Sequence, residues 1–149
     1  QKGYMRLQIE SIPQSSWGVS LANLLPKEDW DKIRKKVIKG AGYKCKYCGP
    51  VDLPLHCHEV WEFKYSEQRL VRFDCVCELC HDSTHYFGTT QRYKNNPTYI
   101  EKVMKHLEEV NGITRKQLLA YISTRKEINK KRAKKTYKIT VGKWVLAWK

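Results

Sequence analysis

The stretch "CELCHDSTHYFG", residues 77–88, places a Cys-x-x-Cys pair directly before a His-x-x-x-His pair. The spacing of four residues puts His81 and His85 on one face of a helix, where both imidazoles are able to bind the same ion. Because the pattern ends at Gly88, we predict one short helix over residues 78–88.

A second Cys-x-x-Cys pair lies upstream in "CKYCG", residues 45–49, and 28 residues separate the two pairs. Two such pairs supply four thiolates, which is the ligand set of a tetrahedral structural zinc ion. Free cysteine is also commonly buried as a small apolar residue, but two correctly spaced pairs favour a metal site. The sequence therefore predicts a structural Zn²⁺ bound by Cys45, Cys48, Cys77 and Cys80.

Between the two pairs lie "LHCHEVWEF" (residues 55–63) and "QRLVRFDCV" (residues 68–76), both rich in strand-forming residues. The polar segment that separates them predicts a two-stranded hairpin. Alternation along the first strand directs His56 and His58 to one face and Cys57 to the other. A neutral histidine is suited to proton transfer near pH 7, so His58 is a candidate general base.

The predicted zinc site would bring the helix over residues 78–88, which carries His81 and His85, next to this hairpin. Cys57 is therefore a candidate ligand for a second ion, together with His81 and His85. A pair of surface histidines is the alternative for His81 and His85. Glu59 and Glu62 are interpreted either as partners that orient the base or as surface acids.

The flanking segments carry further helix and strand patterns. Helical spacing of apolar residues, with capping residues or proline at the start, predicts helices over residues 26–40, 96–112 and 114–135. Alternating patterns predict short strands over residues 5–12 and 136–149, with Gly142 marking a bulge.

The chain carries 29 Lys and Arg against 15 Asp and Glu, a formal net charge of +14. Half of this excess lies in residues 125–138, where eight Lys and Arg accompany one Glu. A soluble protein this basic usually binds a polyanion, most often nucleic acid, and a solvated basic surface is the alternative. We predict that nucleic-acid phosphates are contacted by Lys130, Lys131, Arg132, Lys134 and Lys135.

Taken together, a Cys-x-x-Cys pair, a hairpin with a reactive histidine and a Cys-x-x-Cys-His-x-x-x-His helix resemble the HNH endonucleases of bacteria and phages. The segments "CHEVWEF", "QRLVRF" and "CELCHDSTHYFG" carry the resemblance, which extends from near Met5 through Trp148. It implies an α+β fold with a ββα-metal core held by a four-cysteine zinc site, flanking helices and a C-terminal strand. It also implies metal-dependent hydrolysis of phosphodiester bonds, with DNA as the expected substrate.

The resemblance also implies a role for each matching side chain. His58 matches the base that activates water, and Cys57 matches the first ligand of a catalytic ion. His81 matches the position just after the second Cys pair, and His85 matches the closing histidine. The expected catalytic ion is Mg²⁺, Mn²⁺, Ni²⁺ or Zn²⁺. Because thiolate prefers zinc to Mg²⁺, Cys57 and the histidines could instead form a second structural zinc site.

Two further classes of function fit the same residues. A zinc-stabilised basic domain could bind nucleic acid without catalysis, or it could inhibit a host protein on an HNH-like scaffold. Only the nuclease requires His58, His81 and His85 together, so these three residues distinguish the classes.

Composition also predicts the compartment and the organisation of the chain. No stretch resembles a membrane helix or a signal peptide, so we expect a cytoplasmic protein with no membrane partner and no disulfides. Cys75 is then simply a core residue. We interpret residues 1–4 as a possible expression remnant, 5–112 as the zinc-containing core with flanking helices, and 113–149 as a basic helix and strand packed on that core.

Overall fold

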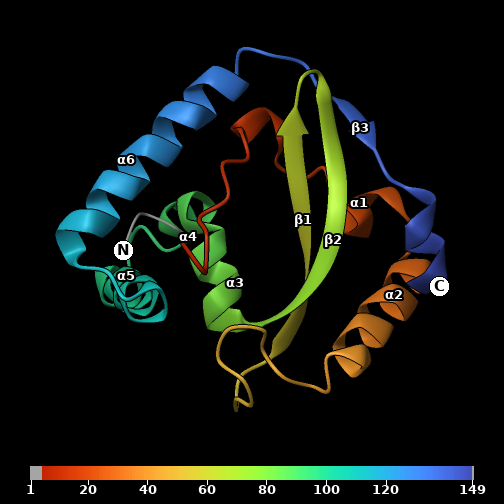
Figure 1. The fold of residues 1–149 in the computed structure, drawn as a ribbon, viewed down its shortest axis with the longest axis horizontal. Coiled ribbons are helices and arrows are strands. Elements are labelled where there is room, and N and C mark those ends of the chain that lie inside the picture. Colours follow the sequence, from red (N-terminus) through yellow and green to blue (C-terminus); the bar gives the residue numbers. More distant parts are fainter. Residues whose placement is uncertain (1–4, 149) are drawn as a thin grey trace.

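A computed structural model describes residues 5–148, with a long hairpin at the centre (Figure 1). Residues 1–4, interpreted above as an expression remnant, lie outside the described residues. The strands of the hairpin are β1 (Leu55–Lys64) and β2 (Glu67–Cys77), which pair antiparallel with a bulge between Val60 and Trp61. The short strand β3 (Lys138–Thr140) adds parallel to β2, so the sheet order is β1-β2-β3 and β1 is an edge strand. The predicted hairpin is confirmed, and the fold is α+β.

Helices cover both sides of the hairpin (Figure 1). One side holds α3 (Glu78–Thr84), α4 (Tyr86–Arg92), α5 (Pro97–Asn111) and α6 (Arg115–Arg132). The other side holds α1 (Leu21–Leu24), α2 (Lys27–Gly40) and the 3-10 helix η2 (Lys143–Trp148). A further 3-10 turn, η1, spans Gln14–Ser16. Within residues 5–148, none of the helices combines the length and apolar character needed to span a bilayer.

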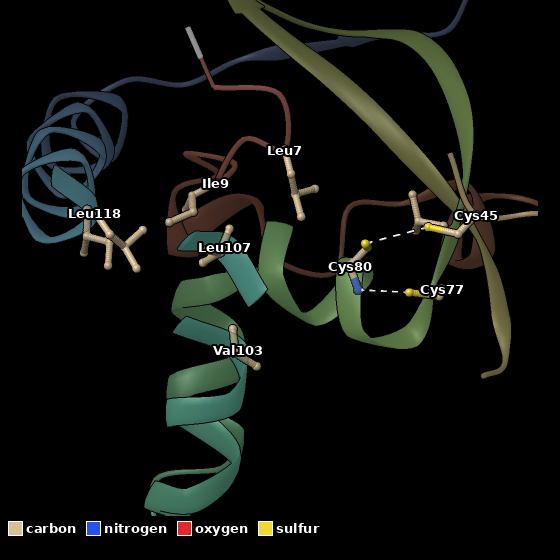
Figure 2. Close-up of a cluster of buried hydrophobic side chains, with 10 residues drawn as sticks. Leu7, Ile9, Cys45, Cys77, Cys80, Val103, Leu107 and Leu118 are labelled. Carbon is tan, nitrogen blue, oxygen red and sulfur yellow. Dashed lines mark hydrogen bonds between the residues drawn. The ribbon is translucent and has the colours of Figure 1, made fainter. Parts of the chain in front are cut away.

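Each side of the hairpin has its own apolar cluster. The first joins the N-terminal segment to α3, α5 and α6 through residues such as Leu7, Leu107 and Leu118 (Figure 2). The second lies between the hairpin and α2, with Ile33 and Leu70 at most 1% exposed. The hairpin is therefore packed on both faces, which fixes the direction of every side chain along β1.

Capping residues set the ends of α5 and α6 as the sequence predicts. The Asn96 side chain accepts a hydrogen bond from the Tyr99 amide, and Pro97 occupies the first turn. Gly112 closes α5 with a left-handed φ of 61°, and a capping box between Thr114 and Gln117 begins α6. Both helices are thereby confirmed.

The single helix predicted over residues 78–88 is wrong, because the chain forms two short helices. α3 ends at Thr84, and α4 begins at Tyr86 and contains Gly88 in its interior. His85 lies between them, with φ −93° and ψ 38°. The hydroxyl of Thr89 donates to the carbonyl of Asp82 and holds the two helices together across this corner.

The strand predicted over residues 5–12 is also wrong: the segment is irregular and pairs with no strand. Its alternation reflects burial, since Leu7 and Ile9 are at most 1% exposed. Side chains of helices satisfy its backbone instead. The Leu7 amide donates to Asn111 at 2.8 Å, and the Ile9 amide donates to the Tyr121 hydroxyl at 3.0 Å. Period-two burial therefore arises here without a sheet.

The C-terminal segment forms much less strand than residues 136–149 predict. Only Lys138–Thr140 pairs with β2, and η2 follows. Gly142 lies between β3 and η2 rather than at a bulge within a strand. A Cβ at this position would lie 2.6 Å from the Trp144 ring, so the close approach of that ring requires glycine. Val145 then packs into the cluster against α2, and this burial favours the 3-10 helix over continued pairing.

Candidate functional site

The four cysteines of the two Cys-x-x-Cys pairs converge where the hairpin meets α3. Their sulfur atoms all lie within 4.8 Å of one another. The Sγ atom of Cys80 is 3.7 Å from that of Cys45 and 3.5 Å from that of Cys48, and the Cys48 and Cys77 sulfurs are 4.0 Å apart. Tetrahedral zinc with bonds of about 2.3 Å requires sulfurs about 3.8 Å apart. The cluster therefore has the size and donor set to hold a metal such as zinc.

Local backbone geometry presents these sulfurs. Gly49 has a φ of 75°, and its backbone forms an antiparallel bridge with Cys45 that closes the first turn. Cys77 ends β2 and caps α3, with its sulfur accepting from the Cys80 amide at 3.5 Å (Figure 2). The hydrogen bond between the Cys45 and Cys80 sulfurs lowers the pKa of Cys45 to about 4 and raises the pKa of Cys80, so one sulfur of the pair carries a negative charge and the other a proton.

His106 on α5 is a neighbour of this cluster that the sequence analysis does not include. Its Nε2 atom lies 3.1 Å from the sulfur of Cys80 and 3.8 Å from that of Cys48. Burial lowers the pKa of His106, so a neutral ring can donate its N–H to a thiolate. The contact ties α5 to the cysteine cluster, and only tertiary packing brings it about.

A second cluster joins three histidines from two elements. His58 on β1 is 4% exposed, and one ring nitrogen from each of His58, His81 and His85 lies within 4.8 Å of the others. Ring centroids are 4.6 Å apart for His81 and His85, and 4.9 Å apart for His58 and His85. The structure thus brings together the three histidines that the sequence selects.

The histidines differ in their electrostatic surroundings. Burial, together with the other histidines, lowers the pKa of His81 to about 2 and that of His85 to about 4. Both rings are therefore neutral near pH 7, as a metal ligand must be. Burial also lowers the pKa of His58, but the charge and hydrogen bond of Glu10 outweigh it and raise the pKa above its ordinary value.

Glu10 is the residue of this site that the sequence analysis misses. Its Oε1 atom forms a short hydrogen bond with Nε2 of His58. Its backbone amide donates to the Thr84 carbonyl at 2.9 Å, which fixes the N-terminal segment beside the end of α3. Among the described residues, the side chains close enough together to bind one metal ion are the three histidines, and Glu10 is not one of them. His58 therefore has Glu10 on one ring nitrogen and the His81–His85 pair nearby.

Cys57 lines the same cavity as the histidines, but among residues 5–148 the group within mutual ligand distance is His58, His81 and His85 without Cys57. This corrects its assignment as a metal ligand. Strand alternation points it to the opposite face of β1, where it packs with Leu21 and Ile33. Burial raises the pKa of its thiol to about 12. Because Cys57 lies outside the histidine group, a second zinc site that includes it also loses its basis.

Two acidic residues of β1 near the site have other partners. Glu59 accepts from the Leu21 amide and from the Trp61 indole, which secures the start of α1. Glu62 pairs with Arg69 on the surface of the hairpin. Neither of these acids orients His58; that contact belongs to Glu10.

His56 precedes this site on the same face of β1. Its ring stacks on His81 with centroids 4.7 Å apart and planes 8° apart. Its Nε2 atom is buried and has no hydrogen-bond partner within residues 5–148. His56 thus supports the ring of His81 by stacking.

A cavity of about 470 Å³ opens onto the histidines along the edge strand β1. Its wall includes the three histidines and Glu10, together with Trp17, Arg34, His56 and Arg92. Arg92 also donates to Asp82 at 3.0 Å, and the hydroxyl of Tyr99 donates to the same carboxylate. The buried Asp82 therefore holds Arg92 at the cavity.

The predicted nucleic-acid contacts at the end of α6 divide into two groups. Lys130, Lys131, Lys134 and Lys135 are exposed. Arg132 is half-buried: it donates to the Ser11 carbonyl at 2.6 Å and lies 4.6 Å from the centre of the Phe63 ring. Arg132 therefore attaches α6 to the N-terminal segment and the hairpin. The exposed cationic surface is the four lysines, of which Lys130 pairs with Glu127 at 3.1 Å.

No family model, curated protein or solved structure matches this chain. The class that its own fold and site define is an α+β protein with a four-cysteine cluster able to hold a metal such as zinc. Beside that cluster it carries a group of three histidines, of which His58 is buried and His81 and His85 are partly buried.

Proposed function

We propose that this protein is a metal-dependent endonuclease of the HNH type, which hydrolyses phosphodiester bonds with DNA as the expected substrate. The observation that carries the proposal is the arrangement of Glu10, His58 and the His81–His85 pair at one cavity. A base held by a carboxylate, next to two neutral imidazoles, is suited to metal-assisted hydrolysis.

His58 serves as the general base in this proposal. Glu10 holds Nε2 of His58, which orients the ring and leaves Nδ1 to accept a proton from the attacking water. Because Glu10 acts through His58, it is a positioning residue. The packing of β1 on both faces keeps the His58 ring in place.

His81 and His85 would hold the catalytic ion. Both come from α3 and its end, and α3 is joined to the hairpin through the cysteine cluster. When bound, the ion supplies positive charge that polarises the phosphate and favours the neutral form of His58. Arg34 and Arg92 at the same cavity would attract the phosphate backbone.

A plasmid-nicking assay tests this proposal directly. Purified protein is expected to nick supercoiled DNA when one of Mg²⁺, Mn²⁺, Ni²⁺, Co²⁺ or Zn²⁺ is added. His85→Ala should lower the affinity for the second ion and reduce cleavage at a given metal concentration. His106→Ala is the matched control, because His106 contacts the cysteine cluster and not the cavity.

Absence of cleavage with every ion, on both DNA and RNA, would overturn the enzymatic proposal. A second candidate would then take its place: a non-catalytic nucleic-acid-binding module. The observation that favours it is the exposed group of four lysines on and just after the last turn of α6. Binding through these residues requires none of the three histidines.

Binding to nucleic acid should depend strongly on salt and partly on these lysines. We expect that changing Lys130, Lys131, Lys134 and Lys135 to Gln weakens binding to many sequences alike. If each contacts one phosphate, the slope of log K against log salt should fall by about 3.6 on duplex DNA and about 2.8 on a single strand. Fluorescence anisotropy over a salt series measures both quantities.

The matched control removes the same charge from the opposite side of the hairpin. Lys27, Lys32, Lys35 and Lys39 are exposed on α2, and their replacement by Gln should change affinity much less. Equal effects of the two sets would indicate that net charge, not the end of α6, determines binding.

A further inference from the structure

A second cavity, of about 390 Å³, also includes His58 and Glu10 in its wall. The rest of its wall differs from that of the first cavity: β2, the N-terminal segment and the first cysteine turn contribute Arg6, Lys46, Tyr47, Arg72 and Asp74. Since both cavities share the His58–Glu10 pair, that pair lies at the boundary between them.

The cations of this second cavity are held in place by the ring of Tyr47 and the carboxylate of Asp74. Arg6 and Lys46 lie 5.5 and 5.7 Å from the centre of the Tyr47 ring. Lys46 and Arg72 also contact the same oxygen of Asp74, at 3.3 and 3.0 Å. These contacts reduce the freedom of three otherwise flexible side chains before any ligand binds, which lowers the entropy cost of binding.

The charges of this group do not cancel. Asp74 is 6% exposed and neutralises one of the three cations, while Glu10 is bonded to His58. About half of the Lys46 and Arg72 side-chain surfaces remains open to solvent. Converging cations that exceed the local acids form a site for an anion with several oxygen acceptors, such as a phosphodiester group.

We propose that this second cavity is a phosphate-binding subsite for the nucleic-acid backbone. In this arrangement the substrate crosses the His58–Glu10 pair, with one flank in the cavity that contains Arg34 and Arg92. The other flank lies against Arg6, Lys46 and Arg72. The inference rests on the proposed nuclease function for its substrate class, and it adds the path of the strand.

Anisotropy with a labelled single-stranded oligonucleotide, without added divalent ions, tests the subsite. The double variant Arg6→Gln and Lys46→Gln leaves Arg72 in place, so the buried Asp74 keeps a partner. We expect a loss of affinity of about fivefold or more and a fall in the salt slope of about 1 to 2. Lys102→Gln with Lys105→Gln removes two exposed charges from α5 and is the matched control.

Photo-crosslinking of an oligonucleotide containing 4-thiouridine or 4-thiothymidine supplies a second readout. We expect a crosslinked peptide that contains Tyr47, with the RNA and DNA versions alike if the phosphodiester itself is recognised. Equal affinities of the double variant and its control would overturn the subsite, as would crosslinks confined to α6. Neither readout requires cleavage, so the subsite and the nuclease proposal can fail independently.

Discussion

Cys48→Ser is expected to unfold or aggregate the protein. The four sulfurs lie at the mutual distances of a tetrahedral zinc site, and the cluster joins the first cysteine turn, β2 and α3. Binding of structural zinc contributes on the order of 10 kcal/mol of folding free energy in small zinc domains. Because Cys48 itself is exposed, the substitution removes a ligand without opening a cavity in the core.

Elemental analysis and thermal unfolding measure this effect. Wild-type protein should contain one tightly bound zinc, and chelation should reproduce the loss of structure caused by Cys48→Ser. Cys75→Ala is the control, because Cys75 is buried outside the four-sulfur group and should lose only its packing. A well-folded wild-type protein that contains no metal would contradict the zinc site.

His58→Ala is expected to abolish cleavage while leaving zinc content and DNA affinity largely intact. The variant lacks the group that takes the proton from water, and such a group contributes a rate factor of about a hundred to ten thousand. Single-turnover cleavage under saturating metal measures the rate, since it separates chemistry from binding.

His56→Ala provides the matched control for this experiment. His56 lies two residues earlier on the same face of β1 and stacks on His81. It does not share the hydrogen bond that joins His58 to Glu10. Its removal should lower the rate far less than removal of His58. If His58→Ala instead lost the second ion, His58 would be a ligand of that ion rather than the base.

The sequence alone determined the local features of this protein. The spacing of the cysteine pairs predicted the four-sulfur cluster, since a Cys-x-x-Cys turn presents both sulfurs to one point by itself. Strand-forming segments predicted the hairpin, and caps at Asn96 and Thr114 predicted where α5 and α6 begin. These features depend on residues a few positions apart, so pattern and propensity are sufficient.

Strand alternation by itself argues against Cys57 as a ligand beside the histidines. It placed His58 and Cys57 on opposite faces of β1, and the structure has them so. Once β1 is packed on both faces, the side chain of Cys57 cannot turn toward His81 and His85. For the side-chain direction of Cys57, the two-residue period of a strand was therefore a better guide than the ligand position implied by the resemblance.

Only the tertiary structure decided which distant side chains meet. Glu10 reaches His58 because Asn111, Tyr121 and Thr84 hold the backbone of the N-terminal segment. His106 reaches the cysteine cluster because α5 packs on α3. No local pattern distinguishes a glutamate on an irregular segment from a surface acid. Such contacts join residues far apart in the chain, and their geometry follows from packing of the whole core.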